Sequence, residues 1–410
     1  MDNSQRVIII GAGIAGLSAA IELEEQGLTP VILEKSDRAG GCIKTDRVDG
    51  WLLDRGFQVL LTAYPTARKI LDYDALDLQT FQPGSIIYSE QGRSKIGDPS
   101  RNMGFLWPTL ISGVGSLSDQ IKVLSLNNEM KRISLETIFS EPEITSMQFL
   151  ETYGFSQKII ENFFQPFFSG IFFDEALVTS SRKLRYVFKM FAEGYAAIPK
   201  QGMEAIPKQM VARLKNTVFR FNTQVASVYS GSVRLASGDE MKADQVIIAT
   251  EGVGHKNNAE WKGCHTFYFE VDYSSHKMPI LGLLAIKNTL VNNLYFVDDL
   301  LGRKNDKSLL SVSVINDKSL SVEEMEMGIR KELNTHCNIE ADRLVKHYHI
   351  PKSIPVIDRH VQLPIPEKVR LRDGVWLAGG HCNNGSINGA MDSGIAAARF
   401  VVQELAAANP

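Results

Sequence analysis

The stretch that decides the fold is RVIIIGAGIAG, residues 6–16, in which an apolar run leads straight into three spaced glycines. The apolar run, residues 7–10, has the continuous hydrophobicity of a parallel strand that is buried on both faces. Gly11 permits a tight turn after this strand, and Gly13 lets the backbone come close to a pyrophosphate. Gly16 lets the following helix pack closely against the strand. The stretch therefore predicts a strand–turn–helix unit that binds the phosphates of a nucleotide.

The residues after the glycines complete a dinucleotide-binding unit. A helix is predicted over residues 14–26, and its first N–H groups, at Ile14 and Ala15, lie at the positive end of the helix dipole, where anions bind. A second strand is predicted over residues 30–33. Glu34 follows it, and its carboxylate can accept a hydrogen bond from a ribose 2′-hydroxyl. An acid at this place disfavours a 2′-phosphate, so FAD or NAD fits better than NADP.

Length and composition set the general class of the protein. The 410 residues are too many for one compact core, so two domains are expected. A net charge of −3 gives no signal for a nucleic-acid partner. The four cysteines are scattered without the spacing of metal ligands, so we expect no metal site and a cytoplasmic protein with reduced thiols. The first strand starts too early to leave room for a signal peptide, and no apolar run is long enough to span a membrane.

Two further segments favour FAD over NAD. The first is RAGG, residues 38–41, in which Arg38 can neutralise phosphate charge and the glycine pair lets a loop fold under the pyrophosphate. The second lies near the C-terminus, where a predicted strand at 375–378 and a polar turn lead into an alanine-rich helix predicted over 387–406. Reduction places negative charge on the N1/C2=O edge of a flavin, and the N-terminus of a helix stabilises such charge.

These segments together resemble the FAD-dependent amine oxidase superfamily, and within it the phytoene desaturase-like and protoporphyrinogen oxidase-like proteins. The sequences LDRGF at 53–57, FAEGYAAIP at 191–199, GMEAIP at 202–207 and VASV at 225–228 fit the same group. So does the pattern AG…GSINGA…SG between residues 378 and 394. The likeness covers nearly the whole chain in order. It is specific for FAD and only loosely informative about the substrate.

The resemblance implies a noncovalent FAD held by residues from both ends of the chain. Glu34 would bind the adenosine ribose, Gly56 would lie close to the flavin ring, and Val225 would meet the adenine end through its backbone. The start of the last helix would face the pyrimidine edge of the flavin. The implied cofactor-binding residues are Gly11, Gly13, Ile14, Ala15, Gly16, Glu34, Lys35, Arg38, Gly40, Gly41, Gly56, Val225, Gly379, Gly380, Ser386, Ile387, Asn388 and Gly389.

One position departs from the pattern of the family. The family usually has an aspartate in the turn after Ala-Gly, where it bonds the ribityl or phosphate region, and this chain has Gly380. Three readings stay open: FAD is held less tightly, Asn383 or Asn384 substitutes for the acid, or the site is degenerate and empty.

The predicted fold class is α/β, with a discontinuous Rossmann-like FAD-binding domain and a second α+β substrate domain. The FAD-binding domain is expected to comprise residues 1–80, 206–254 and 351–410, and the substrate domain residues 81–205 and 255–350. Only one dinucleotide fingerprint is present. Electrons are therefore expected to come from an organic substrate rather than from NAD(P)H, and to leave to dioxygen or a quinone.

A small hydrophobic organic molecule is the expected substrate. Residues 163–173 hold six phenylalanines, which form either an apolar wall or ordinary core packing. In residues 181–191, Arg182, Arg185 and Lys189 lie along one helix among apolar residues, a pattern that indicates either a contact with an anionic membrane or a solvated face. Peripheral membrane association therefore stays open. No catalytic residue is evident, and His381 is a weak candidate for an acid or base.

The sequence thus predicts an FAD-dependent oxidoreductase that transfers a hydride from a C–H bond of its substrate to flavin N5. Two alternatives stay open. One is a non-catalytic protein that binds a hydrophobic ligand or a prenylated partner, as Rab GDP-dissociation inhibitors do on the same fold. The other is a flavin-dependent mutase. The sequence does not name the substrate, the electron acceptor or the oligomeric state.

Overall fold

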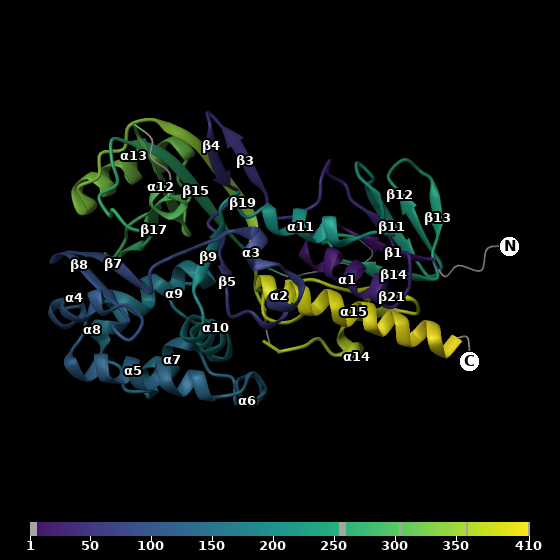
Figure 1. The fold of residues 1–410 in the computed structure, drawn as a ribbon, viewed down its shortest axis with the longest axis horizontal. Coiled ribbons are helices and arrows are strands. Elements are labelled where there is room, and N and C mark those ends of the chain that lie inside the picture. The colour runs from purple at the N-terminus through teal and green to yellow at the C-terminus, as the bar shows by residue number, and fades with distance from the viewer. Residues whose placement is uncertain (1–5, 254–259, 303–305, 358–359, 409–410) are drawn as a thin grey trace.

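The protein is built on two main sheets at opposite sides of the molecule (Figure 1), in a computed structural model that describes residues 6–253, 260–302, 306–357 and 360–408. The first sheet has the strand order β10-β2-β1-β14-β21-β20, and all neighbours run parallel except β20 at the edge. Its strands are β1 (Val7–Ile10), β2 (Val31–Leu33), β10 (Val218–Arg220), β14 (Gln245–Ile248), β20 (Arg370–Arg372) and β21 (Val375–Leu377). Helices α1 (Ile14–Glu25) and α15 (Ile387–Ala408) pack on one face.

Both faces of this sheet are covered, which explains the unbroken apolar run of β1. Val7 and Ile9 belong to the apolar cluster that contains α1 and α15. Ile8 and Ile10 belong to a second cluster with the three-stranded sheet of β11 (Val225–Tyr229), β12 (Ser232–Leu235) and β13 (Glu240–Lys242). The predicted α/β class with Rossmann-like layering is confirmed.

Two glycines bring α1, its strand and α15 into direct backbone contact. A Cβ added at Gly16 would lie 2.0 Å from the carbonyl oxygen of Gly11, and one added at Gly394 would lie 2.1 Å from that of Ala15. No side chain fits at either position. The helix α15 therefore lies directly on α1, as Figure 1 shows, and α1 lies directly on the turn that precedes it.

The second sheet has seven strands in the order β19-β15-β18-β17-β16-β7-β8. They are β7 (Gly84–Ser89), β8 (Gly92–Gly97), β15 (Trp261–Val271), β16 (Leu281–Leu284), β17 (Val291–Phe296), β18 (Ser308–Val314) and β19 (Leu344–Pro355). One face packs on α13 (Val322–Glu332) through Phe267 and Phe269. A capping box precedes α13, because the side chains of Ser321 and Glu324 each accept a hydrogen bond from the backbone N–H of the other.

Most of the remaining helices lie between β8 and β9 in the chain. They are α4 (Leu106–Ile111), α5 (Leu117–Arg132), α6 (Leu135–Ser140), α7 (Ser146–Thr152), α8 (Gln157–Ile159), α9 (Gln165–Phe172) and α10 (Ser181–Glu193). Elsewhere the chain forms α2 (Pro65–Ile70), α3 (Tyr73–Leu76), α11 (Ala205–Arg213), α12 (Val297–Leu301) and α14 (Pro366–Val369). Two small sheets pair β3 (Thr45–Val48) with β4 (Trp51–Asp54), and β9 (Ala196–Pro199) with β5 (Leu60–Leu61) and β6 (Leu78–Thr80). The domain boundaries stay a prediction.

The helix expected to offer a cationic face to solvent or to a membrane is buried instead. The side chains of Arg182, Arg185 and Lys189 on α10 are 8%, 6% and 9% exposed. Arg185 forms an ion pair with Glu141, and Lys189 donates a hydrogen bond to the carbonyl oxygen of Met130 at 2.9 Å. Groups from neighbouring helices thus pair with these cations inside the protein. Both interpretations of this helix from the sequence, a contact with an anionic membrane and a solvated face, are wrong.

Two properties of the described residues bear on membrane and metal binding. None of the helices there combines the length and the apolar character that crossing a membrane requires. No group of three or more His, Cys, Asp or Glu side chains in the same ranges could hold a metal ion.

Gly394→Ala is expected to lower the free energy of unfolding by about 1–3 kcal/mol, because the added methyl group would push α15 away from α1. Urea denaturation followed by circular dichroism measures the change. Gln403→Ala, at an exposed position of α15, is the control and should leave the midpoint unchanged. If Gly394→Ala and Gln403→Ala have the same free energy of unfolding, the close contact between α15 and α1 at Gly394 does not contribute to stability.

Candidate functional site

The glycine turn after β1 leaves an anion-binding helix end open. Gly11 has a φ of +103°, and a Cβ there would lie 2.9 Å from the carbonyl oxygen of Ala249, so only glycine fits. Gly13 is the N-cap of α1, where no side chain caps the helix and no acid occupies the first turn. The first N–H groups of α1, from Ile14 and Ala15 onward, are therefore available to a phosphate.

A second glycine loop closes on this turn from the other side. The N–H of Gly40 donates a hydrogen bond to the carbonyl oxygen of Ala12 at 2.9 Å. A Cβ added at Gly41 would lie 3.1 Å from the Cα of Gly13. Both glycines have positive φ values, of +126° and +60°. Because four of these five residues are glycines and the Ala12 side chain is buried, residues 11–13 and 40–41 form a backbone cradle that fits a pyrophosphate, which we call the glycine cradle.

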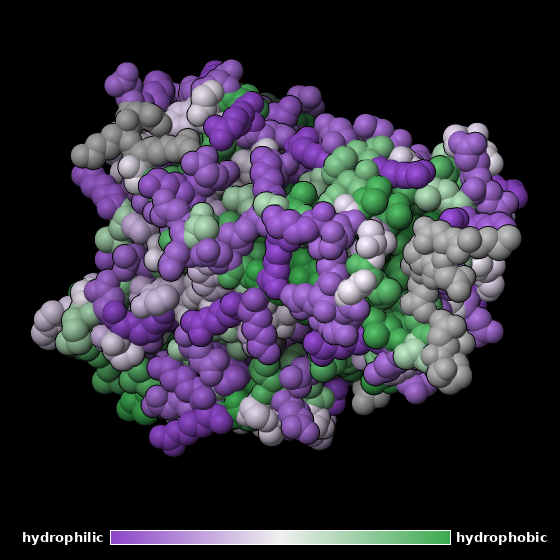
Figure 2. All heavy atoms as spheres, turned by 45° about the vertical axis from the view of Figure 1, so that its right-hand side comes forward, coloured by the Kyte–Doolittle hydropathy of each residue, from purple (hydrophilic) through white to green (hydrophobic). Residues whose placement is uncertain are grey.

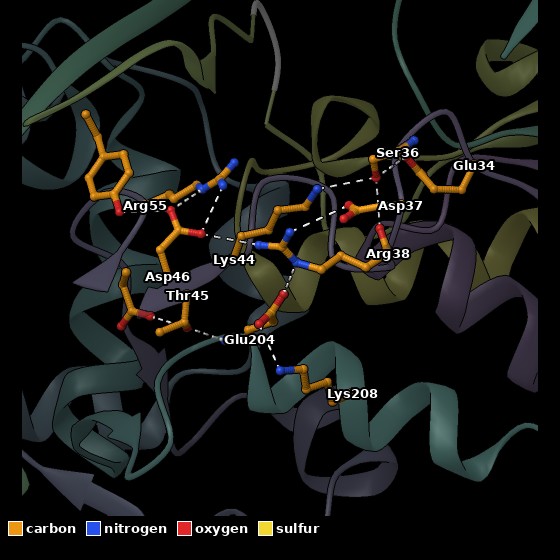
Figure 3. A network of polar contacts seen from close by, with 12 residues as sticks. Glu34, Ser36, Asp37, Arg38, Lys44, Thr45, Asp46, Arg55, Glu204 and Lys208 are labelled. Atoms are coloured by element: carbon orange, nitrogen blue, oxygen red, sulfur yellow. Dashed lines mark hydrogen bonds and ion pairs between the residues drawn. The ribbon is translucent and has the colours of Figure 1, made fainter. Parts of the chain in front are cut away.

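Glu34 lies at the end of β2, beside the glycine cradle (Figure 3). Its carboxylate is 7% exposed and accepts hydrogen bonds from the N–H of Ala12 at 2.8 Å and from the N–H and hydroxyl of Ser36 at 2.9 and 2.7 Å. These donors hold the carboxylate in place, and it retains a lone pair for a ribose hydroxyl. The neighbouring Lys35 is exposed. Val225 is buried in the apolar cluster that also contains the last residue of β2.

Arg38, which was expected to neutralise phosphate charge, forms ion pairs with carboxylates in this structure (Figure 3). Its Nε is 2.6 Å from Glu204 Oε1, and a terminal nitrogen is 3.4 Å from Asp46. Asp46 in turn pairs with Arg55 at 2.8 Å, and Glu204 pairs with Lys208 at 2.9 Å. Arg38 therefore ties the loop after β2 to α11 and to the hairpin β3–β4. Only the Nε of Arg38 bonds Glu204, so the N–H groups of its terminal nitrogens remain the donors that could reach a phosphate.

The hairpin β3–β4 places Gly56 next to the second sheet. The carboxylate of Asp54 accepts hydrogen bonds from the Thr45 hydroxyl at 2.5 Å and from the N–H of Met203 at 2.9 Å, and burial raises the pKa of Asp54 to about 6. Gly56 has a φ of +95°, and a Cβ there would lie 3.4 Å from the Cδ1 of Ile350 on β19. Gly56 thus lies where the two main regions of the molecule meet.

The turn before α15 is held by its own side chains. The Asn383 amide donates to the carbonyl oxygen of Gly389 at 2.8 Å, and the Ser386 hydroxyl donates to Asn384 Oδ1 at 2.7 Å. Both asparagines are buried. Their side chains therefore stabilise the turn, and neither extends from it in place of the missing acid. Asn388, in the first turn of α15, accepts a hydrogen bond from the backbone of α2.

The two residues after Gly380 show no sign of strong reactivity. The ring of His381 lies against Gly379, since a Cβ added there would be 2.5 Å from its Cε1. Burial raises the pKa of the Cys382 thiol to about 11, so this thiol stays protonated at neutral pH. Gly380 itself has room for a side chain, because the nearest atom to an added Cβ, the Cα of Gly385, is 3.5 Å away.

Sequence reasoning missed a buried lysine at the same end of α15. Lys183 on α10 is 5% exposed, and its Nζ lies 3.4 Å from the point where a Cβ of Gly385 would sit. Its ammonium is 5.4 Å from the ring centre of Phe172, and no carboxylate in the described ranges pairs with it. Burial, and then the charge of Lys262, lowers the pKa of Lys183 to about 8. The sequence SRKLRY reads as a surface helix, so only the packing of α10 reveals this residue.

Comparison with known proteins decides the family. The model of a family described as flavin containing amine oxidoreductases matches residues 14–255, which is more than half of the chain. The chain belongs to this family. The predicted superfamily and its cofactor, FAD, are thereby confirmed, and the glycine cradle and the open end of α1 fit the phosphates of that cofactor.

Curated relatives of this flavoprotein include snake L-amino-acid oxidases. L-amino acid oxidase Lm29 of Lachesis muta is 26% identical over 272 residues, which is 60% of this chain and 51% of that protein. A shorter match, to L-amino-acid oxidase BjussuLAAO-I of Bothrops jararacussu, is 31% identical over 137 residues, 32% of this chain and 28% of that protein. The chain spans about half the length of the first of these relatives.

Solved structures of the same fold cover nearly the whole flavoprotein. A putrescine oxidase variant has a TM-score of 0.71 and 17% identity over 97% of this chain and 99% of its own. A candidate protoporphyrinogen oxidase from Exiguobacterium sp. 255-15 has a TM-score of 0.69 and 18% identity, with 98% and 99% covered. Cyclohexylamine oxidase from Brevibacterium oxydans has a TM-score of 0.68 and 15% identity, with 98% and 100% covered. At these identities the likeness shows the fold. The role of each predicted site residue stays a prediction.

Gly380→Asp is expected to tighten FAD binding by roughly tenfold, because a carboxylate in this turn can accept a charge-assisted hydrogen bond from the cofactor. Titration of the apoprotein with FAD, followed by flavin fluorescence, gives the dissociation constant. Gly380→Ala fills the same space without the acceptor and should bind like the wild type. Weaker binding by the aspartate variant alone would show that FAD does not pass this turn.

Lys183→Met is expected to stabilise the protein by about 2–3 kcal/mol at pH 7. Between pH 10.5, the ordinary pKa of lysine, and about 8, the unfolded chain binds a proton that the folded protein does not, so wild-type stability falls as the pH drops through this range. Methionine removes this loss. The difference in the free energy of unfolding between Lys183→Met and the wild type, measured by thermal unfolding at each pH, should therefore be largest below pH 8. It should vanish near pH 10.5. The control is Lys158→Met, at an exposed lysine. A stability difference between Lys183→Met and the wild type that does not change with pH would contradict the lowered pKa of Lys183.

Proposed function

We propose that the protein is an FAD-dependent oxidase or dehydrogenase that takes a hydride from a C–H bond of a small organic substrate and transfers it to flavin N5. The observation that carries this proposal is the glycine cradle at the open end of α1. Membership of the flavin-containing family supports a bound redox cofactor at this place. The single dinucleotide fingerprint supports an organic molecule, rather than NAD(P)H, as the electron donor.

Each end of the cofactor would be held by different residues. The glycine cradle would bind the pyrophosphate, and Glu34 would accept a hydrogen bond from the ribose. Residues 386–389 would direct the N–H groups of α15 to the pyrimidine edge, and Lys183 would add positive charge beside Gly385. FAD supplies the hydride acceptor at N5 when it is bound. Positive charge at this end favours the negative charge that accompanies reduction.

The proposed substrate is apolar, but the phenylalanine-rich segment supports this less than its composition suggests. Phe164, Phe168 and Phe172 are at most 1% exposed and pack in the core. Phe163 and Phe167 are partly exposed and stack at 5.5 Å. We propose that only this second pair contacts a substrate. We further propose that the two sheets belong to separate domains, with the substrate between them, and that dioxygen accepts the electrons, with a quinone as the alternative.

Protein reconstituted with FAD is expected to be yellow and to lose its colour anaerobically with one class of donor. The panel comprises primary amines, L-amino acids, porphyrinogens and carotenoid precursors, and stopped-flow absorbance follows the flavin. Readmitted air should restore the colour if dioxygen is the acceptor. Glu34→Ala, which removes the ribose acceptor, should need at least tenfold more FAD for the same occupancy.

Two results would overturn the proposal in favour of its alternatives. Protein that stays colourless and cannot be reconstituted with FAD would be a binding protein on the same fold. Protein that is reduced by dithionite but by no organic donor, and that then isomerises a sugar nucleotide, would be a mutase.

A further inference from the structure

A partly enclosed cavity of about 650 Å³ lies beside α15. Figure 1 shows α2, α14 and α15, three of the helices that line it, and α1, α6, α10 and α11 contribute the rest of its helical wall. Most of the surface seen in Figure 2 is hydrophilic, and apolar residues reach it in separate patches. The wall of this cavity is mainly apolar, with Ile21, Pro65, Phe139, Ile395 and Phe400 among its residues. A cavity of this size and character is typical of a binding site for a small organic molecule.

The cavity is separate from the place expected for FAD. Neither the glycine cradle nor Glu34 nor Gly56 lines it. Of the predicted cofactor-binding residues, it contains Asn388 alone. The side chain of Asn388 accepts a hydrogen bond from the N–H of Thr66 at 2.9 Å and donates one to Asp392 at 2.8 Å. A ligand in the cavity would therefore contact α15 through side chains, whereas the flavin is expected at backbone N–H groups.

One carboxylate in the wall, that of Asp392, lacks a counter-ion. It accepts hydrogen bonds from the Thr66 hydroxyl and from the amide of Asn388, and no cation among the described residues forms an ion pair with it. Burial raises the pKa of Asp392 to about 6, although the hydrogen bond from Thr66 and then the charge of Lys69 lower it. These two stabilising contacts are thus too weak to offset the burial, so a closer cation would stabilise the ionised carboxylate.

The other charged side chains of the wall do not supply this cation. Arg399 forms an ion pair with Glu22 at 2.9 Å, and Arg213 forms one with Glu25. These two pairs leave Lys69, which is exposed to water that screens its charge. Asp392 is therefore the one carboxylate of the wall that remains for a charged ligand.

An ammonium ion that carries an apolar group matches this wall best. Its N–H groups can donate charge-assisted hydrogen bonds to Asp392, and its apolar group can displace water from the apolar wall. Tyr186 offers a second acceptor, because its buried hydroxyl makes no hydrogen bond of good geometry within the described ranges. A carboxylate or phosphate ligand would instead place a second negative charge beside Asp392, and a neutral ligand would leave its charge without a partner.

We propose that this cavity binds a small organic ammonium ion with an apolar group, with Asp392 as its counter-ion, at a site separate from the redox centre. Binding here does not depend on hydride transfer. The side chain of Asn388 joins Asp392 to the first turn of α15. Occupancy of the cavity therefore acts on the part of the molecule where the pyrimidine edge of FAD is expected.

Isothermal titration calorimetry with cumylamine tests the proposal on the full chain loaded with FAD. The carbon that bears the amine in this probe has no hydrogen, so the probe cannot serve as a hydride donor. The wild type is expected to bind cumylamine at pH 8 at least tenfold more tightly than cumyl alcohol, its neutral analogue. Asp392→Asn should lose this preference. Asp373→Asn, which removes an exposed carboxylate outside the cavity, is the matched control and should bind like the wild type.

The pH dependence of the wild type is a second test, which needs no variant. Cumylamine stays protonated between pH 5 and pH 8, so a change in its affinity reports the protein. Protonation of Asp392 removes the counter-ion, and the affinity at pH 5 should therefore be about tenfold lower than at pH 8.

Three results would overturn the proposal: a wild type that does not bind cumylamine, equal affinities for the amine and the alcohol, and an affinity that stays constant between pH 5 and pH 8. So would a preference for the amine that Asp392→Asn retains, because the amine then occupies another place, such as the redox centre. Protein that takes up no FAD and still binds cumylamine through Asp392 would support this site and contradict only the proposed function.

Discussion

Direct contact between backbones, made at glycines, is the constraint on which the rest of the site depends. Gly16 lets α1 touch the turn after β1, and Gly394 lets α15 touch α1 at Ala15. Because these contacts contain no side chain, they cannot adjust by a change of rotamer. The helix start expected to face the phosphates and the helix start expected at the flavin are therefore fixed relative to each other by one rigid stack.

The parts of the fold and of the site that could be predicted from the sequence are those that depend on neighbouring residues. The turn at Gly11 needs a positive φ, and the capping box at Ser321 needs an acid three residues later. Glu34 could be placed for the same reason, because its partners Ala12 and Ser36 belong to the same strand–helix–strand unit. These patterns identify the fold class and predict the position of the nucleotide site.

The parts that could not be predicted depend on contacts between distant residues. Arg38 pairs with Glu204, which is 166 residues away, and no local signal distinguishes this partner from a phosphate. The cations of α10 look like a solvated face, yet Arg185 is paired with Glu141 inside the protein. Lys183, three residues after Ser180, is buried on the same helix, and no carboxylate among the described residues pairs with it. Burial of charge is a property of the packed molecule, since it is set by which elements surround a helix.

The distribution of the site along the chain has a consequence for biosynthesis. Both sides of the glycine cradle come from residues 11–41, whereas residues 386–389 follow much later in the chain. During synthesis, the segments of the glycine cradle therefore precede β14, which pairs with β1, and α15, which packs on α1. The predicted halves of the cofactor site can be joined only after both of these later segments have been made.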